Sequence, residues 1–515
     1  MSIASEITRL QNAKASIKSS IESKGVTVSS STKLDGYSTL IDSIQTGSAL
    51  HPMNVSNIVA KTNNGSITLT WSDPQDTYDD DGQLMCSWAG TKVVYKTGSY
   101  PSNQNDGTVA VNSTTRNQYS TNGLTISGLT NGTEYYFQIF TYSDTGYYNT
   151  NSVNRISAIP GAVHIYGVRH QLTDSGTTWE RLEDAIGLTA NATHDGTAVT
   201  NDFDSLYPWS DIISCNYDFT NDTVNAYYGD TSFKFDGSNG DVMTKIPEFW
   251  WKREQKDGYE YQYIADGEVE GFTKSNEFMV GRYTISGSSS AVYSRSGYSP
   301  LVSTKRTDFR TYARNKGTNT GIIDWRYFLL QMLYLVEYAN TNSQSTLGYG
   351  VCDASFKVNS GGCDTLGMKS GCVTNDKKHS VIYRGIEDIF GNVYQWVDGI
   401  NINSRRTYIC YNPANYVDDT FSGNYSALSY TNSSSSGYVS KLGYDSNNSL
   451  IAMPTEVSGS SSTYYCDYYD QNSGNKIACV GGDFSSGANV GLWYWSCYYS
   501  SSYSDSYIGS RLLKY

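Results

Sequence analysis

The chain has 515 residues, of which 17% are charged and 14% aromatic, and its formal net charge is −13. Gly (47) and Tyr (45) are both abundant and Pro (9) is scarce, which favours a β- and loop-rich extracellular or virion protein over a helical cytosolic enzyme. Nucleic acid is excluded as a partner, because its binders carry basic patches and the sequence has no dense Lys/Arg stripe. The length allows two to four domains.

Residues 1–48 predict a short helical module. Three- and four-residue steps place one seam along a helix, formed by Ile3, Ile7, Leu10, Lys14, Ile17 and Ile21. A second short helix is predicted from Leu34, Tyr37, Leu40, Ile41 and Ile44. Two interpretations stay open: a hairpin that packs on itself, or an attachment and oligomerisation module. The segment resembles the N-terminal modules of bacteriophage tail proteins, which implies contact with other tail proteins.

No export signal or membrane span is predicted. Met1–Lys24 is amphipathic and has no continuous apolar region. The longest apolar stretch, Trp325–Ala339, contains Arg326 and Glu337 and predicts a core helix, since it is too short to cross a bilayer. Release by lysis, as for a phage structural protein, would reconcile an extracellular composition with the missing signal. A specialised secretion route is the alternative.

Residues 51–160 alternate in period two between turn signals, as the strands of a small all-β sandwich do. Strands are predicted at Val55–Ala60, Ser66–Ser72, Lys92–Tyr95, Leu124–Ile126 and Thr133–Thr141. With Trp71, Leu129 and the run Gly132–Tyr135, the region resembles the fibronectin type III family. The resemblance implies that the hydroxyl of Tyr135 bonds to upstream backbone, and that the module is a spacer.

Residues 161–515 predict an α+β domain that begins at Pro160-Gly161. One helix is predicted from the spacing of Trp179, Leu182, Ala185 and Ile186, and a buried one over Asp324–Asn340. Aromatic strands are predicted at Glu248–Arg253, Tyr259–Ile264 and Phe278–Thr284. Residues 424–465 are rich in Ser, Tyr, Asn and Gly, which predicts a long surface loop or a disordered segment.

Two segments carry a family resemblance in this last domain. They are YRGIEDIFGNVYQWVDGI at 383–400, which contains Gly391–Trp396, and the C-terminal run from Gly481, which contains Gly481–Phe484 and Ile508–Leu512. Together they resemble the C-type-lectin-like fold of the formylglycine-generating-enzyme type. They are most similar to the variable proteins of diversity-generating retroelements, including those on phage tails. The resemblance implies a ligand-binding domain with a variable region at about 481–510.

The composition of this region agrees with adenine-directed diversification. Residues 485–507 contain eight Ser and five Tyr, with no Lys, Arg, Glu, Gln or Met, and AAC or AAT codons randomised at their first two bases never yield Lys, Glu, Gln or Met. Trp493 and Trp495 cannot arise that way and are interpreted as scaffold. A low-complexity loop is the alternative. The ligand-binding positions expected are Ser485, Ser486, Ala488, Asn489, Tyr494, Ser496, Tyr498, Tyr499, Ser500, Tyr503, Ser504, Asp505, Ser506 and Tyr507.

Catalytic sites are disfavoured. An oxidase of the formylglycine-generating type needs a Cys pair after the Gly-Gly strand, where Ser485 and Ser486 stand, and a depolymerase needs paired carboxylates in a cleft. The nine cysteines include no CxxC pair and predict isolated buried thiols, with one disulfide conceivable among Cys352, Cys363 and Cys372. No cofactor is expected, and a structural Ca²⁺ is left open.

The sequence thus predicts a non-enzymatic receptor-binding protein of a phage tail, active in host adhesion and located on the virion after lysis. Its partner would be a host cell-surface receptor, protein or glycan, bound by a diversified Tyr/Ser surface on a homotrimer. The alternative is a retroelement-diversified bacterial surface or signalling protein.

Overall fold

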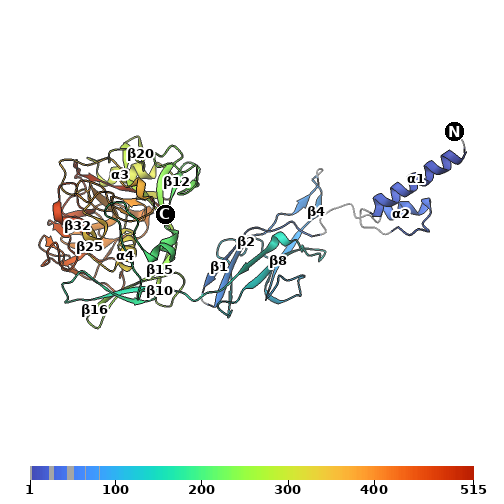
Figure 1. The fold of residues 1–515 in the computed structure, drawn as a ribbon, viewed down its shortest axis with the longest axis horizontal. Helices are drawn as coiled ribbons and strands as arrows, with labels where there is room; N and C mark the ends of the chain where they lie inside the picture. The colour runs from blue at the N-terminus through green and yellow to red at the C-terminus, as the bar shows by residue number, and fades with distance from the viewer. Residues whose placement is uncertain (1–2, 23–27, 43–50, 64, 80–81) are drawn as a thin grey trace. The chain divides into compact units, whose positions relative to one another are not determined.

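The computed structural model describes residues 3–22, 28–42, 51–63, 65–79 and 82–515. The chain divides into two compact units, Met1–Ala162 and Val163–Tyr515, close to the boundary predicted at Pro160-Gly161. The described parts form a multidomain, mostly β-stranded protein with few helices (Figure 1).

The N-terminal segment contains the helices α1 (Ile3–Glu22) and α2 (Tyr37–Asp42), joined through the 3₁₀ turn Leu34–Gly36. Its small core consists of Ile21, Val28 and Tyr37, with Leu40 packed against it. On this single chain, the seam residues Ile7, Leu10 and Ile17 of α1 are exposed. Among the seam residues whose side chains are described, Ile21 packs in this core, and the predicted residue Ile44 lies outside the described residues.

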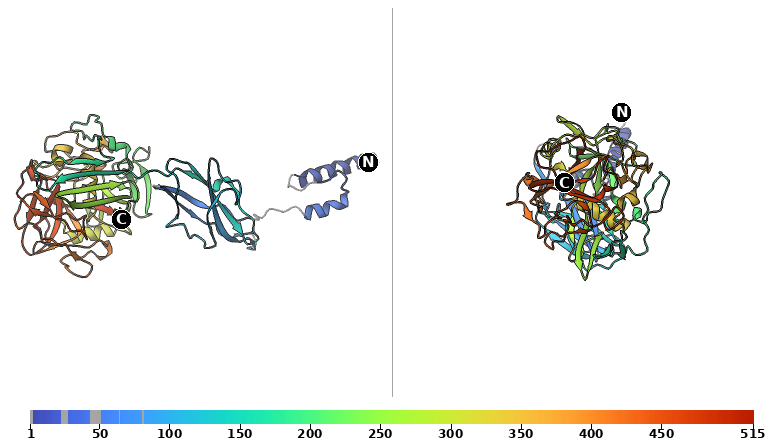
Figure 2. Two further views of the ribbon diagram at one scale, coloured as in Figure 1. Left: turned by 90° about the horizontal axis from the view of Figure 1, so that it is seen from below. Right: turned by 90° about the vertical axis from the view of Figure 1, so that its left-hand side faces the viewer.

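Residues 51–160 form two facing sheets (Figure 2). One contains β1 (Ser56–Asn63), β2 (Ser66–Ser72) and β7 (Leu124–Ser127), and the other β6 (Thr108–Ser113), β5 (Trp88–Thr97), β8 (Tyr135–Ser143) and β9 (Arg155–Ala158). A short hairpin joins β3 (Thr77–Tyr78) and β4 (Leu84–Cys86). Trp71 is buried between the sheets, and the hydroxyl of Tyr135 accepts a hydrogen bond from the Thr130 amide at 3.0 Å, as predicted.

The second unit contains two smaller sheets. The first runs in the order β11 (Glu180–Glu183), β10 (Ile165–Gln171), β16 (Tyr259–Ala265), β15 (Phe249–Lys256) and β17 (Thr273–Ser275). The second runs β13 (Thr223–Tyr227), β12 (Ile213–Asp218), β14 (Asp241–Ile246), β18 (Phe278–Thr284), β34 (Arg511–Lys514) and β21 (Thr320–Ile322). The three predicted aromatic strands are present as β15, β16 and β18.

The largest sheet of the second unit carries both family-like segments. Its order is β26 (Ser426–Ala427), β25 (Arg406–Ile409), β24 (Tyr394–Asn403), β31 (Asn475–Gly481), β32 (Gly491–Cys497), β30 (Tyr468–Gln471) and β27 (Gly437–Tyr438), with β33 (Ile508–Gly509) paired to β24. The remaining hairpins are β19 (Ser286–Ser288) with β20 (Ala291–Tyr293), β22 (Ile382–Tyr383) with β23 (Ile386–Glu387), and β28 (Lys441–Leu442) with β29 (Pro454–Glu456).

Helices are short in this unit: α3 (Arg306–Arg314), α4 (Tyr327–Tyr338) and α5 (Ser343–Leu347). The predicted core helix is α4, which is buried along its whole length. Because it is apolar almost all round, with Gln331 and Glu337 as its polar residues, it packs into the main core of the unit rather than lying on its surface.

One prediction for this unit is wrong. The segment Trp179–Ile186 contains the strand β11, which pairs with β10, and no helix, and Ile186 is 69% exposed rather than on a buried helical face. Of the two interpretations left open for residues 424–465, the loop fits, because the segment contains only strands of two or three residues and its few apolar residues are anchored in the core. These anchors include Leu428, Val439, Leu442, Leu450 and Ile451.

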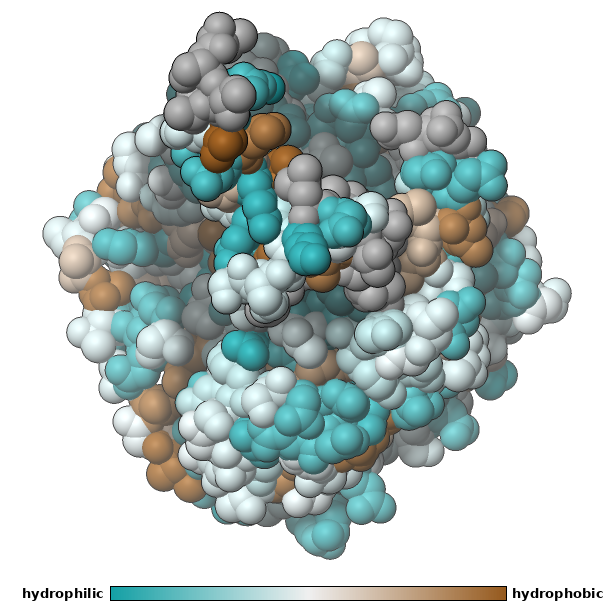
Figure 3. All heavy atoms as spheres, turned by 90° about the vertical axis from the view of Figure 1, so that its right-hand side faces the viewer, coloured by the Kyte–Doolittle hydropathy of each residue, from teal (hydrophilic) through white to brown (hydrophobic). Residues whose placement is uncertain are grey.

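The described residues contain neither a disulfide nor a helix that could span a membrane. All nine cysteines lie in the described residues, and each is buried and free, so none of the conceivable disulfides among Cys352, Cys363 and Cys372 is formed. The described helices include none with the length and apolar character to cross a membrane. The face shown in Figure 3 is mostly hydrophilic or neutral, with hydrophobic residues in small separate spots.

Candidate functional site

The turn before β24 is fixed by backbone geometry that its residues favour. Gly391 has a φ of 75°, and a side chain there would meet the Val351 carbonyl oxygen at 2.9 Å. Asn392 adopts a φ of 62°, and its amide donates to Asp388 at 2.8 Å and accepts from the Val358 amide at 2.9 Å. The Gly-Asn pair therefore sets the start of the central strand.

A second turn begins the predicted variable region. The carboxylate of Asp483 accepts hydrogen bonds from the Ser485 amide at 2.9 Å and from the Ser486 hydroxyl at 2.8 Å. An Asp that bonds backbone two residues on forms a local turn without help from other strands. This carboxylate holds Ser485 and Ser486 at the surface, where Ser485 is exposed.

The strand β32 is anchored by the two predicted scaffold tryptophans. Trp495 is fully buried and stacks on Phe328 of α4, with ring centroids 4.8 Å apart and planes at 18°. Trp493 is buried against Tyr334 of the same helix. Ile508 and Leu512, which follow the variable region, are also fully buried. The variable region is thus held at both ends by the core.

Residues 498–507 fold back over the other face of the same sheet. The ring of Tyr499 lies edge-on to Tyr394 and to Trp396, at 6.4 and 6.1 Å, and stacks on Tyr503 at 4.6 Å. Backbone bonds close the segment on the sheet, from the Ile477 amide to the Tyr499 carbonyl and from the Tyr394 amide to the Tyr507 carbonyl. The loop is therefore packed in place.

This packing corrects two of the predicted binding positions. Tyr494 and Ser496 are buried, at 4% and 1% exposure, because the folded-back segment covers the face of β32 on which they lie. Their place is among the rings beneath the surface, where the Tyr494 hydroxyl bonds that of Tyr394 at 2.8 Å. They support the predicted surface and are not displayed by it.

The other predicted positions are exposed or partly exposed. Of the fourteen positions, two are buried, which leaves twelve. We call these twelve the Tyr/Ser surface: Ser485, Ser486, Ala488, Asn489, Tyr498, Tyr499, Ser500, Tyr503, Ser504, Asp505, Ser506 and Tyr507. Tyr498 is the most open of its tyrosines, at 43% exposure.

Hydroxyl groups on the surface are linked to one another. The hydroxyl of Tyr503 bonds that of Tyr507 at 2.8 Å and donates to Asp505 at 2.7 Å. These bonds to Tyr507 and Asp505 raise the pKa of Tyr503, and the bond from Tyr503 lowers the pKa of Asp505. At neutral pH the tyrosines are therefore neutral donors and acceptors around one carboxylate.

Sequence reasoning missed several residues that complete the site. Tyr394 underlies it, Asp419 accepts a hydrogen bond from Ser501, and the ammonium group of Lys476 lies 5.9 Å from the ring centre of Tyr498. Tyr394 stands two residues before Trp396 in the same strand, so period-two spacing could have placed it on the same face. Asp419 and Lys476 come from distant segments and leave no local signal.

The same region offers neither a metal-binding cluster among its described residues nor an ionised thiol at neutral pH. Within the described ranges, His, Cys, Asp and Glu side chains form no group of three or more suited to a metal ion. Burial raises the pKa of Cys497 to about 12 and that of Cys479 well above its ordinary value. Both thiols are therefore protonated at neutral pH, and the thiolate is the reactive form.

No protein-family model matches the chain, and a search of curated proteins gave no significant match. Among solved structures, the chain is similar to chitinase ChiA74 from Bacillus thuringiensis, at 11% identity and a TM-score of 0.15. The matched region covers 46% of this chain and 30% of the chitinase chain. A similarity this weak carries no conclusion about fold or activity.

Proposed function

We propose that the protein is a receptor-binding protein of a phage tail, which attaches to a host-cell receptor through the Tyr/Ser surface. The observation that carries this proposal is the arrangement of twelve exposed or partly exposed positions over a framework of buried aromatic rings. The finer fold assignments belong to the same proposal: a fibronectin type III spacer and a C-type-lectin-like binding domain.

The chemistry of the surface supports recognition. Tyrosine offers a large amphipathic contact at a low cost in side-chain entropy, and Ser and Asn supply adaptable hydrogen bonds, as in antibody paratopes. Asp505 is the only ionisable Asp, Glu, Lys or Arg among the twelve positions, so a partner covers little charge. Twelve residues make up about half of one side of a standard interface of 20–30 residues.

The exposed seam of α1 supports an oligomeric attachment module. Ile7 and Leu10 are 51% and 53% exposed on the single chain, and such a seam is buried when helices associate. We place homotrimerisation and contact with other tail proteins here. Three copies of the Tyr/Ser surface would raise the apparent affinity by about 10²–10⁴ where the geometry allows.

A binding role is also supported over an oxidase role by the thiols. Cys479 and Cys497 lie on the neighbouring strands β31 and β32, but both are buried and held protonated by the surrounding apolar packing. An oxidase of the formylglycine-generating type would need reactive cysteines open to its substrate peptide.

The test is adhesion of the full-length chain to host cells. The double variant Tyr498→Ser/Tyr503→Ser should reduce cell binding at least tenfold, whereas Tyr147→Ser, a 51% exposed tyrosine outside the Tyr/Ser surface, should leave it unchanged. Equal binding by all three proteins would refute the proposal. A nearby DNA copy of codons 481–510 that differs only at adenines would establish diversification.

A further inference from the structure

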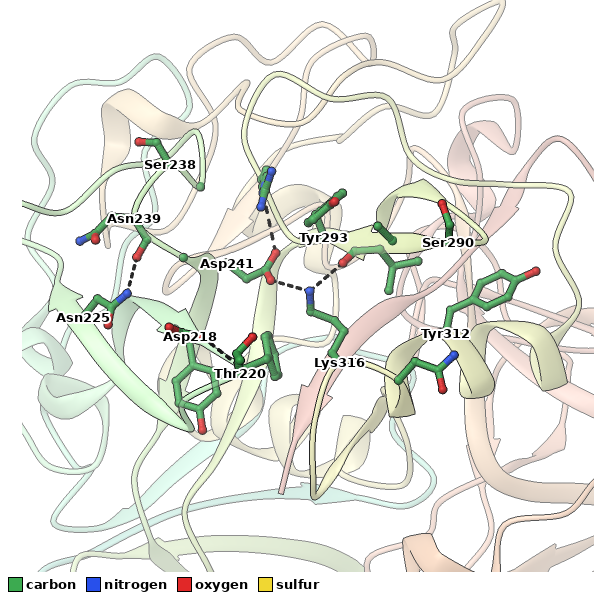
Figure 4. A pocket seen from close by; sticks show the side chains of 18 of the residues that line it. Asp218, Thr220, Asn225, Ser238, Asn239, Asp241, Ser290, Tyr293, Tyr312 and Lys316 are labelled. Carbon is green, nitrogen blue, oxygen red and sulfur yellow. Dashed lines mark hydrogen bonds and ion pairs between the residues drawn. The ribbon is translucent and has the colours of Figure 1, made fainter.

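A polar cavity of about 570 Å³ opens in the second unit, and residues 484–507 are not among its lining (Figure 4). Its walls are the end of β12 with the following turn, residues 237–241, the β19–β20 hairpin and the end of α3. We call it the Arg295 pocket. A volume of about 300–1,000 Å³ is typical of a site for a small ligand.

Two of its charges neutralise each other. The carboxylate of Asp241 is buried, lies 2.7 Å from the ammonium group of Lys316, and accepts the Ser294 amide at 2.8 Å. The ammonium group of Lys316 also donates to the Val292 carbonyl at 2.7 Å. Figure 4 shows Lys316 directed at Asp241. This pair is therefore satisfied without a ligand.

Arg295 is positioned but not satisfied. Its guanidinium group lies 3.8 Å from the ring centre of Tyr293, and its nearest ion-pair distance to Asp241 is 4.0 Å, beyond a normal hydrogen bond. Among the described residues, no partner is found for its buried Nε atom. The side chain also passes directly over Gly237, where a Cβ would meet its Cγ at 2.5 Å.

The carboxylates near Arg295 do not take up its donors. Hydrogen bonds from Ser238, whose amide donates to Oδ1 at 2.9 Å, are the main cause that lowers the pKa of Asp236, with smaller contributions from Lys234 and Arg295. The lining residue Asp218 bonds the Thr220 amide at 2.8 Å and the Asn221 side chain at 2.7 Å. Arg295 lines the cavity and its side chain is partly exposed. Because its Nε is buried, the terminal guanidinium nitrogens are the donors left for a ligand carboxylate.

The rest of the lining suits a hydroxylated ligand. Side-chain amides and hydroxyls offer donors and acceptors at Asn225, Ser238, Asn239, Ser290 and Asn315, and aromatic rings at Phe219, Tyr293 and Tyr312 offer faces for C–H groups. Sugars combine these two requirements, because each ring carries hydroxyl groups at its rim and C–H groups on its faces.

We propose that the Arg295 pocket binds an acidic saccharide, with the carboxylate of a uronic-acid type unit on Arg295 and its hydroxyls on the surrounding amides. The lining carries two cations, Arg295 and Lys316, and two carboxylates, Asp218 and Asp241, so it accepts the single charge of a carboxylate better than the multiple charges of a nucleotide phosphate chain. The proposal stands on this geometry alone and does not require that the Tyr/Ser surface bind a receptor.

Calorimetry on the full-length chain can test it with three probes: methyl β-glucuronide, its uncharged amide and methyl β-glucoside. We expect the glucuronide to bind at least tenfold more tightly than either neutral probe. Arg295→Gln should remove that preference, and Ser290→Asp, at an exposed hairpin position, should weaken glucuronide binding more than it weakens binding of the neutral probes, because it adds a negative charge. Tyr498→Ser should not change the result.

Several outcomes would overturn the proposal. They are equal binding of the three probes, no binding of any of them, or binding of an acidic tetrapeptide in preference to the glucuronide. Because Ser290→Asp leaves the core untouched, it keeps the test decisive if Arg295→Gln does not fold. Loss of cell adhesion in the Tyr498→Ser/Tyr503→Ser variant with intact glucuronide binding would separate this pocket from the proposed receptor site.

Discussion

The hydroxyls of Tyr394 and Tyr494 bond to each other at 2.8 Å, although the strands β24 and β32 that carry them are separated by β31. Tyr394 belongs to the first family-like segment and Tyr494 to the second. Both are buried beneath the Tyr/Ser surface, and the Tyr394 hydroxyl also lies 3.4 Å from that of Ser486. This pair therefore connects the buried aromatic rings beneath the surface to the turn at Asp483–Ser486.

Removing either hydroxyl should destabilise the second unit by a similar amount. We expect Tyr394→Phe and Tyr494→Phe each to lower its free energy of unfolding by about 1 kcal/mol, because the first removes the hydroxyl partner of Tyr494 and the second leaves Tyr394 only the longer contact to Ser486. The double variant should lose clearly less than the sum, since it removes both partners. Tyr498→Phe, at an exposed position, is the control, and urea unfolding is the measurement. Strict additivity would contradict the pairing.

The two buried indoles Trp396 and Trp495 should respond differently to replacement by Phe. The Trp396 Nε1 donates to the Thr304 carbonyl at 3.1 Å, whereas no partner is found for the Trp495 Nε1 among the described residues. Trp396→Phe should therefore cost about 1 kcal/mol more than Trp495→Phe. Trp495→Ala should cost about 3–5 kcal/mol and release the Tyr/Ser surface from its support. Thermal unfolding of the three variants checks the order.

Asp467 should make the stability of the second unit fall as pH rises. Its carboxyl is buried beneath β32 and accepts the Trp493 amide at 2.8 Å, and burial raises its pKa well above the ordinary value. A raised pKa favours the neutral form, so this stabilisation is complete below about pH 4 and is lost as pH rises through the folded-state pKa. Asp467→Asn should flatten the pH dependence, by up to about 1.4 kcal/mol per pH unit.

Asp505 provides a control of opposite sign. The hydroxyl of Tyr503 lowers the pKa of this carboxyl, so its stabilisation is present above about pH 4 and is lost as pH falls. The measurement is the free energy of unfolding of wild type, Asp467→Asn and Asp505→Asn between pH 3 and pH 8. As pH rises, wild type should lose stability relative to Asp467→Asn and gain stability relative to Asp505→Asn. Parallel curves for wild type and Asp467→Asn would show that Asp467 ionises freely in the folded protein.

The buried tryptophans that hold β32 to the core could be predicted from the sequence, but the packing of residues 498–507 over the sheet could not. Trp493 and Trp495 were predicted as scaffold from the expectation of diversified AAC or AAT codons, which cannot produce tryptophan, and both are buried. The burial of Tyr494 and Ser496 depends on residues 498–507 returning over the sheet, and a serine-rich stretch gives no sign of its direction. Nothing in the motifs indicated that a displayed and a supporting tyrosine would alternate in one segment.

Local periodicity also failed where a strand partner decided the structure. Trp179, Leu182 and Ala185 have helical spacing, yet β11 pairs with β10 and its Glu180 carboxylate bonds Arg169 at 2.7 Å across the ladder. Pairing between strands overrides weak helical spacing in so short a segment. In 424–465, composition indicated a loop, but a few aliphatic side chains were enough to fix it on the core.

The seam of α1 should determine the oligomeric state of the full-length chain. Leu10 lies exposed in this seam, and a charge there would face the neighbouring helices of a trimer. We expect light scattering to give the mass of a trimer for wild type and of a monomer for Leu10→Asp, while Gln11→Asp, exposed and outside the seam, stays trimeric. Lys14 interrupts the seam, and its ammonium group lies 5.6 Å from the ring centre of Tyr37. Lys14→Ile should strengthen the trimer if the seam pairs with other chains; a monomeric wild type would leave the self-packed hairpin as the correct interpretation.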